Sequence, residues 1–128
     1  MDIAKRAFEL GLQGYCCAQV IVKIGLEYKE SENVELIKAM RGLCRGLHTQ
    51  DACGALSGGA CLLALFSDKD APRLVHELTQ WFEQSFGTLT CAGLIGEGGS
   101  DPQKCRDITG RTCEYCFGLL EQEGLLDA

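Results

Sequence analysis

The fold class of this chain is decided by the stretch LVHELTQWFEQSF, residues 74–86. Its apolar side chains recur at i, i+1, i+4, i+7 and i+8, a spacing that gathers them on one face of an α-helix packed against a core. These side chains are Leu74, Val75, Leu78, Trp81, Phe82 and Phe86. The stretch therefore predicts an amphipathic helix with one buried face.

Helical patterns also occur on both sides of this stretch. The predicted segments are 3–11, 16–24, 34–40 and 51–65 before it, and 105–122 after it. Residues 93–101 are rich in glycine and are expected to form a loop. No window alternates apolar and polar residues with the period of two that a strand requires. The sequence therefore predicts an all-α fold, a compact single-domain bundle of five to six helices over residues 1–128.

Length, charge and hydropathy exclude several classes of function. A chain of 128 residues is long enough to bury a core in one domain. Its formal net charge of −6 argues against nucleic acid or an anionic membrane surface as partner, because both attract clusters of Lys and Arg. No apolar run is long enough for a membrane span. No export signal follows the opening residues MDIAKR, so we expect a cytoplasmic protein.

Cysteine is the most informative residue type, with nine in 128 residues. Thiols in the cytoplasm are normally kept reduced, so a high cysteine count there favours metal binding or redox chemistry over a framework of disulfides. The odd number agrees, because nine cysteines cannot all pair within one chain. The sequence thus indicates thiol or metal chemistry more clearly than any substrate.

Cys53 is the strongest single candidate for a functional thiol. If Asp51 caps the predicted helix 51–65, Cys53 occupies its second position, where free N–H groups and the helix dipole favour a thiolate. Gly54 and Gly58 follow, and their lack of a side chain would let the backbone approach a cofactor or another helix closely. The alternative is that Cys53 is a small buried apolar residue in a tightly packed helix.

The other cysteines give weaker signals. Cys16 and Cys17 are adjacent, and neighbouring side chains on a helix diverge by roughly 100°, so at most one should face a cluster with Cys53. Cys113 and Cys116 form a CxxC motif, but the helical pattern around it does not suit a thioredoxin-like site, and a metal would need two further ligands.

Four of the cysteines stand in local contexts that match one known family. They are Cys17 in Cys17-Ala18-Gln19, Cys53 in Cys53-Gly54-Ala55-Leu56-Ser57-Gly58, Cys91 after Phe86-Gly87-Thr88-Leu89-Thr90, and Cys105 at the start of the last helix. With these residues the chain resembles the family named for its C-GCAxxG-C-C cysteine pattern, a small all-helical group to which a redox role is ascribed. The chain departs from the pattern at Ala52, where the family name has glycine.

The resemblance implies a redox site made by Cys17, Cys53, Cys91 and Cys105. Within it we take Cys53 and Cys17 as the candidate catalytic thiols, and we expect Gly54 and Gly58 to lie beside the cofactor. An iron–sulfur cluster at this site is suggested by analogy with a related helical region in split-Soret-type cytochromes. Five additional thiols leave the fourth ligand open among Cys105, Cys113 and Cys116.

Three forms of the site follow from these observations. Four thiolates near helix N-termini could hold an iron–sulfur cluster. Alternatively, the thiols could cycle by thiol–disulfide exchange without a metal, with Cys53 as a low-pKa attacking thiol and Cys17 or Cys91 as its resolving partner. The third form is a structural zinc site with four cysteine ligands in a non-redox helical module. We expect an oxidoreductase or electron carrier without a defined reaction, an unidentified redox partner protein, and a homodimer as one option for assembly.

Overall fold

The computed structural model describes residues 1–126, which contain seven α-helices and no β-strand. The helices are α1 (Ile3–Leu12), α2 (Cys17–Tyr28), α3 (Val34–Met40), α4 (Gly54–Phe66), α5 (Ala71–Phe86), α6 (Cys91–Ile95) and α7 (Pro102–Gln122), with two short helical turns, η1 (Arg41–Leu43) and η2 (Gly46–Gln50). The all-α prediction is therefore confirmed. The predicted number of five to six helices is too low by at least one.

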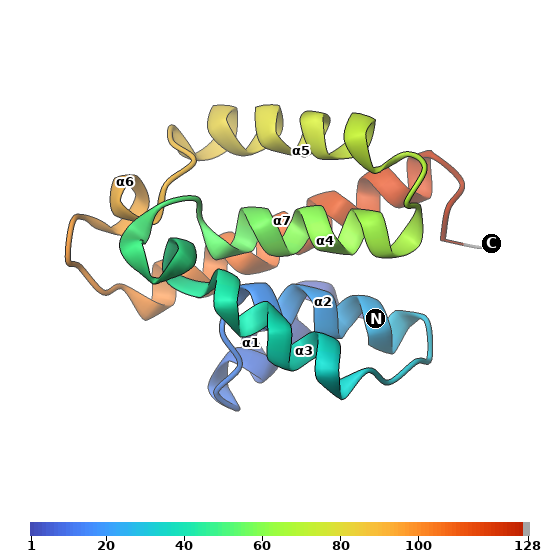
Figure 1. Ribbon diagram of the computed structural model, residues 1–128, viewed down its shortest axis with the longest axis horizontal. Coiled ribbons are helices and arrows are strands. Elements are labelled where there is room, and N and C mark those ends of the chain that lie inside the picture. The colour runs from blue at the N-terminus through green and yellow to red at the C-terminus, as the bar shows by residue number, and fades with distance from the viewer. Residues whose placement is uncertain (127–128) are drawn as a thin grey trace.

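The helices are arranged in three tiers, which Figure 1 shows from the side. The helix α5 forms the upper tier, α4 and α7 lie beneath it, and α1, α2 and α3 form the lower tier. Contacts join α4 to α2, α5 and α7, and they join α1 to α7 and α2. The helix α4 thus lies at the centre of the molecule, and helices of the upper and lower tiers both pack against it.

The amphipathic pattern of residues 74–86 predicts the buried face of α5 correctly. Leu74, Leu78 and Phe82 are fully buried beneath α5, while Val75, Trp81 and Phe86 are partly buried against the same core. Trp81 also stacks in parallel on Tyr115 of α7, with ring centroids 4.2 Å apart. No helix among the described residues is long and apolar enough to cross a membrane.

The additional helix is α6, which lies partly within the stretch predicted as a loop. Thr90 caps it by accepting a hydrogen bond on Oγ1 from the N–H of Gly93 at 3.0 Å, and Leu94 is buried. Because α6 has only five residues, two turns of apolar spacing are never completed and the pattern is not visible in the sequence.

The start of α4 also differs from the prediction. The helix begins at Gly54 with Cys53 as its N-cap, three residues after the predicted start at Asp51. Residues 51–53 are instead extended and bonded to the segment before α6. The N–H of Cys53 donates to the carbonyl of Leu89 at 2.8 Å, and the N–H of Cys91 donates to the carbonyl of Asp51 at 2.8 Å. This pairing holds Cys53 and Cys91 near each other.

Glycines allow α2 and α4 to cross closely. A Cβ atom on Gly58 would lie 2.8 Å from the Cα atom of Ala18, which is nearer than carbon atoms can pack. A Cβ atom on Gly54 would collide with the sulfur of Cys17 and would lie 3.1 Å from the carbonyl oxygen of Leu43. The close crossing therefore requires that both positions lack a side chain.

We predict that Gly58→Ala destabilises the protein, because the added methyl group must push α4 away from the backbone of α2. The expected loss in the free energy of unfolding is about 1–3 kcal/mol, the usual cost of overpacking a well-packed contact. Urea unfolding followed by circular dichroism measures it.

Gly118→Ala is the matched control for this substitution. Gly118 lies within α7, is exposed, and has no atom near the position of an added Cβ. Alanine should stabilise the protein there by roughly 0.5–1 kcal/mol, because it is the better helix former. Equal effects of the two substitutions would contradict a tight crossing at Gly58.

Candidate functional site

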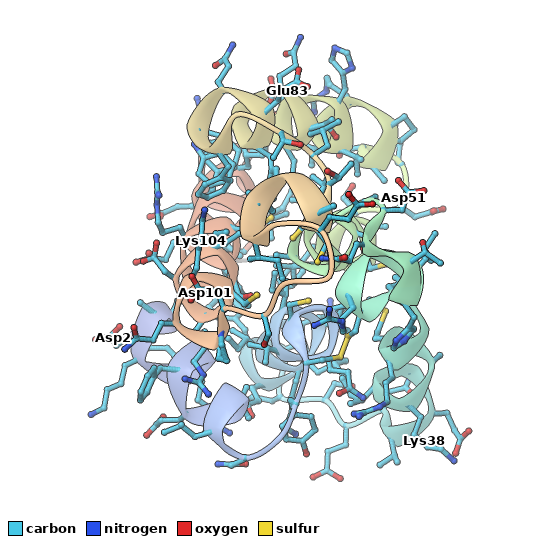
Figure 2. All side chains as sticks on the ribbon, turned by 90° about the vertical axis from the view of Figure 1, so that its left-hand side faces the viewer. Asp2, Lys38, Asp51, Glu83, Asp101 and Lys104 are labelled. Carbon is cyan, nitrogen blue, oxygen red and sulfur yellow. A yellow bond between two sulfur atoms is a disulfide. The ribbon has the colours of Figure 1, made fainter. Side chains whose placement is uncertain are left out.

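The site lies where the N-terminal ends of four helices converge. Cys17 is the first residue of α2, Cys53 is the N-cap of α4, Cys91 is the first residue of α6, and Cys105 lies in the first turn of α7. Figure 2 looks onto this end of the bundle, where several sulfur atoms gather in the interior behind α6. The structure therefore brings together the four cysteines that the sequence singles out.

All four side chains line one small cavity of about 60 Å³. The rest of its lining is mainly apolar, and it contains one charged residue. The complete lining is Cys17, Arg45, Cys53, Cys91, Leu94, Ile95, Cys105, Ile108 and Thr109. Cys53 and Cys91 are buried, whereas Cys17 and Cys105 are half-buried, so the cavity faces solvent on the side of α2 and α7.

Burial controls the acidity of Cys53. The pKa of this thiol is raised to about 12, mainly by burial, and the nearby thiols of Cys17 and Cys91 act in the same direction. The backbone N–H groups of Ala55 and Leu56, in the first turn of α4, lower the pKa by a smaller amount. The low pKa expected for Cys53 from its helix terminus is therefore wrong, because removal from water outweighs the favourable N–H groups.

The pKa values of the two half-buried thiols, Cys17 and Cys105, are also raised. Burial raises the pKa of Cys17, and the backbone N–H of Arg45 opposes this rise. Burial also raises the pKa of Cys105, as do the thiols of Cys17 and Cys91, while the positive charge of Arg45 opposes it. Arg45 thus acts on the site through both its backbone and its side chain.

Arg45 is a site residue that sequence reasoning missed. Its side chain is exposed at the mouth of the cavity, where its guanidinium donates a hydrogen bond to the carbonyl of Gly99 at 3.3 Å. The sequence around it, with Gly42 and Gly46 on either side, indicates only an interruption between helices. Its position depends on an unusual backbone conformation that no spacing rule predicts.

That conformation is a left-handed turn over residues 45–50, which includes the segment labelled η2. Arg45, Leu47, His48 and Gln50 have φ angles of 52°, 60°, 59° and 60°, and Gly46 has 57°. Left-handed backbone costs roughly 1–2 kcal/mol for each residue that carries a side chain. Such a turn persists only where its surroundings enforce it, and strained backbone of this kind is concentrated at functional sites.

Polar contacts fasten the left-handed turn to its neighbours. The His48 Nε2 atom lies 2.9 Å from the carbonyl oxygen of Arg41, and the Gln50 side-chain amide donates to the carbonyl of Gly96 at 2.9 Å. Gly46 has no room for a side chain, since a Cβ atom there would collide with the backbone of Asp51. The turn is thus tied to η1 on one side and to the segment after α6 on the other.

A disulfide between Cys16 and Cys44 lies beside the four-cysteine cavity, with the two Cα atoms 6.1 Å apart. The sequence did not predict this bond. It agrees with the expectation that only one of the adjacent pair Cys16 and Cys17 faces Cys53, because Cys17 lines the cavity and Cys16 turns towards Cys44.

The remaining cysteines lie outside the cavity. Cys113 and Cys116 are fully buried in the main core, where the thiol of Cys116 lies 3.8 Å from the carbonyl oxygen of Gly59. Cys61 is half-buried on α4. Of the three candidates for a fourth site cysteine, only Cys105 therefore lines the cavity with Cys17, Cys53 and Cys91.

The suitability of the cavity for a metal depends on its donors and on their positions. Four thiols are a donor set that iron–sulfur clusters and zinc both use. As placed, residues 1–126 bring no three Cys, His, Asp or Glu side chains close enough together to hold one ion. Binding would therefore require the thiols to move towards each other. Gly54 and Gly58 contact α2, and their predicted contact with a cofactor stays a prediction.

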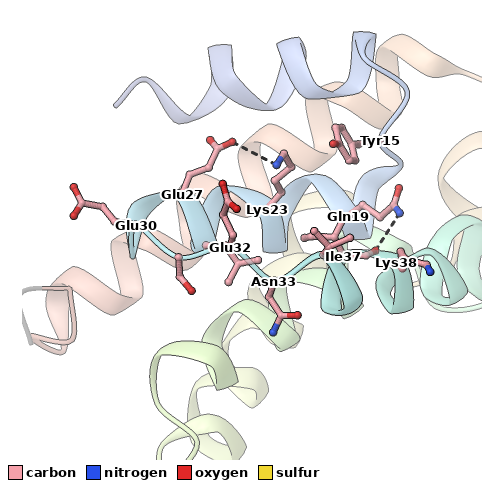
Figure 3. A pocket seen from close by; sticks show the side chains of 12 residues that line it. Tyr15, Gln19, Lys23, Glu27, Glu30, Glu32, Asn33, Ile37 and Lys38 are labelled. Carbon is pink, nitrogen blue, oxygen red and sulfur yellow. Dashed lines mark hydrogen bonds and ion pairs between the residues drawn. The ribbon is translucent and has the colours of Figure 1, made fainter.

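A larger groove of about 700 Å³ lies between α2 and α3, away from the cysteines (Figure 3). It is lined by charged side chains of both signs, among them Lys23 and Glu27, which lie 4.0 Å apart. Gln19 is buried at its end and donates a hydrogen bond to the carbonyl of Ile37 at 3.1 Å. No cysteine in the described part of the chain lines this groove, so it does not compete with the cysteine cavity as the candidate redox site.

The fold and the cavity define a class: a cysteine-rich helical protein with four thiols gathered at converging helix ends. The comparison with known families agrees with this class, since the family described as "Putative redox-active protein (C_GCAxxG_C_C)" matches residues 15–118. The chain belongs to this family. The comparisons with curated proteins and with solved structures gave no match.

We predict that Cys53 of the reduced, metal-free protein reacts slowly with iodoacetamide at pH 8. Because its pKa is raised to about 12 from an ordinary value of 9.0, its thiolate fraction should be lower than that of a free thiol by at least about a hundredfold. The reaction rate should keep rising with pH beyond 9. Peptide mass spectrometry after timed alkylation measures it, with glutathione as the reference thiol.

A Cys53 reaction rate that levels off near pH 7 would contradict this prediction. Such a result would show that the helix terminus stabilises the thiolate more strongly than burial destabilises it.

Proposed function

We propose that this chain is a redox protein whose centre is formed by Cys17, Cys53, Cys91 and Cys105. The observation that supports the proposal is the convergence of these four thiols from four helix ends on one cavity. The membership of the chain in a family described as redox-active points the same way. An iron–sulfur cluster is the form of the centre that we favour.

The donor set and its surroundings support a cluster. Each thiol comes from a different helix, so the four can approach one centre from different directions. Leu94, Ile95 and Ile108 keep water away from the interior side, and backbone N–H groups at the starts of α2 and α4 are available to sulfur atoms. When bound, an iron–sulfur cluster supplies one-electron transfer.

Arg45 supplies positive charge to the same centre. It is the one charged residue in the described lining of the cavity, and its charge favours the thiolate form of Cys105. Four thiolates gathered around one largely apolar cavity would repel each other strongly without compensation. A cation at the mouth of the cavity lowers this cost and leaves the interior apolar.

Thiol–disulfide exchange without a metal is the second candidate. It is favoured by the proximity of Cys17, Cys53 and Cys91, because Cys91 raises the pKa of Cys17 and both of these thiols raise the pKa of Cys53. Two of these thiols would form a disulfide and pass two electrons to a partner protein. The high pKa of Cys53 makes it a poor attacking thiol, so in this form the more exposed Cys17 would attack first.

We predict that protein purified without oxygen contains iron and sulfide and absorbs visible light. Iron and sulfide assays with the absorption spectrum test this. Substitution of Cys17, Cys53, Cys91 or Cys105 by Ser should each reduce the iron content severalfold, because a cluster that loses one thiolate is held weakly.

Cys61→Ser is the matched control, since Cys61 lies on α4 outside the cavity and should not affect iron content. Zinc in place of iron would support the structural site with four cysteine ligands. A protein without metal would leave thiol–disulfide exchange as the better account.

A further inference from the structure

The Cys16–Cys44 disulfide stands at a position where its state can affect the site. Each of its cysteines is followed directly in the chain by a residue that lines the four-cysteine cavity, Cys17 after Cys16 and Arg45 after Cys44. Figure 2 shows the disulfide as a yellow bond on the same end of the bundle as the other gathered sulfurs. The bond therefore joins the two segments that supply Cys17 and Arg45.

The two ends of the disulfide differ in accessibility. Cys16 is half-buried and lines a second cavity, of about 220 Å³, together with Arg45 and Cys105. Cys44 is only 2 % exposed and packs among Ala18, Val22 and other apolar residues. An incoming thiolate can therefore reach Cys16 more readily than Cys44.

The segment after Cys44 is held in a conformation that it would not adopt alone. The left-handed turn, residues 45–50, begins one residue after the disulfide, and four of its residues carry side chains at positive φ. Beyond the disulfide, the turn is tied to its neighbours by exposed hydrogen bonds. Arg45 donates to Gly99, Gln50 donates to Gly96 and accepts from the N–H of Gly98, and His48 contacts the carbonyl of Arg41. Exposed hydrogen bonds are the contacts that open most easily.

We infer that Cys16–Cys44 is a second redox site, distinct from the four-cysteine centre, which is reduced by a dithiol and thereby releases the left-handed turn that carries Arg45. The disulfide acts as a covalent anchor for the strained backbone. When the disulfide is reduced, the turn relaxes and Arg45 moves away from the mouth of the cavity. The thiols of Cys17 and Cys105 then become more accessible to solvent.

The reduction balances with a dithiol as the only co-reactant. One thiolate of the dithiol attacks the sulfur of Cys16, so that a bond forms between these sulfurs and the Cys16–Cys44 bond breaks. Cys44 leaves as a thiolate and takes a proton. The second thiolate of the dithiol then attacks the dithiol's own sulfur in this mixed disulfide. The bond to Cys16 breaks, and Cys16 leaves as a thiolate that is protonated in turn. The dithiol loses two electrons, and the protein gains them as two thiols.

The inference goes beyond the proposed function, and its first readout does not need the four-cysteine centre to carry electrons. Full-length protein is equilibrated without oxygen in mixtures of reduced and oxidised dithiothreitol, quenched with acid and alkylated. Peptide mass spectrometry then reports Cys16 and Cys44 separately from the other seven cysteines. We expect both to become alkylated together as one two-electron couple, while circular dichroism shows that the helices are retained.

Hydrogen exchange provides the second readout. After reduction, peptides that cover residues 45–51 should exchange faster by about tenfold, equivalent to about 1.4 kcal/mol of lost protection. The double variant Cys16→Ser, Cys44→Ser should exchange equally fast in the absence of any reductant. Cys61→Ser is the matched control, because Cys61 packs against the same small apolar cluster but does not anchor the turn.

Two results would overturn the inference. In the first, Cys16 and Cys44 stay bonded in folded protein under fully reducing dithiothreitol, so the disulfide is purely structural. In the second, the couple is reduced but exchange at residues 45–51 is unchanged. Failure of the proposed function would appear elsewhere, as an absence of iron and of redox change at Cys17, Cys53, Cys91 and Cys105.

Discussion

The close crossing of α2 and α4 is the constraint on which the rest of the structure depends. Because Gly58 has no side chain, the backbones of the two helices approach until a Cβ atom there would be 2.8 Å from the Cα atom of Ala18. The same crossing leaves room at Gly54 for the sulfur of Cys17. The packing of two helices thus determines the distance between Cys17 and the start of α4, where Cys53 lies.

The other two site cysteines, Cys91 and Cys105, are brought to the cavity by different contacts. A short antiparallel contact between residues 51–53 and 89–91 brings the start of α6 beside the start of α4. The first turn of α7 supplies Cys105 to the same cavity. Since each helix presents its N-terminus, backbone N–H groups accumulate around the sulfurs and partly offset the cost of burying them. The convergence of helix N-termini therefore brings the thiols together and also lowers the cost of burying their negative charge.

The fold and the site could be predicted from the sequence to different extents. Repeated apolar spacing reveals a helix such as α5, whose face at Leu74, Leu78 and Phe82 is buried as expected. The same spacing cannot reveal the five-residue α6, nor the true start of α4, because that start is determined by hydrogen bonds to Leu89 and Cys91, distant in the sequence. The helix α6 is too short for its apolar spacing to be visible, and the start of α4 is set by tertiary contacts that local rules do not describe.

The same distinction explains what was missed at the site. The four cysteines have recognisable local contexts, whereas Arg45 reaches the cavity through left-handed backbone that only tertiary contacts maintain. The acidity of Cys53 was misjudged for a related reason. Its helix terminus is a local feature that lowers the pKa. Its burial is a tertiary feature, since residues of α6 and α7 line the same cavity, and burial has the larger effect. A site made of buried thiols therefore has properties that follow from its enclosure more than from the position of any cysteine on its own helix.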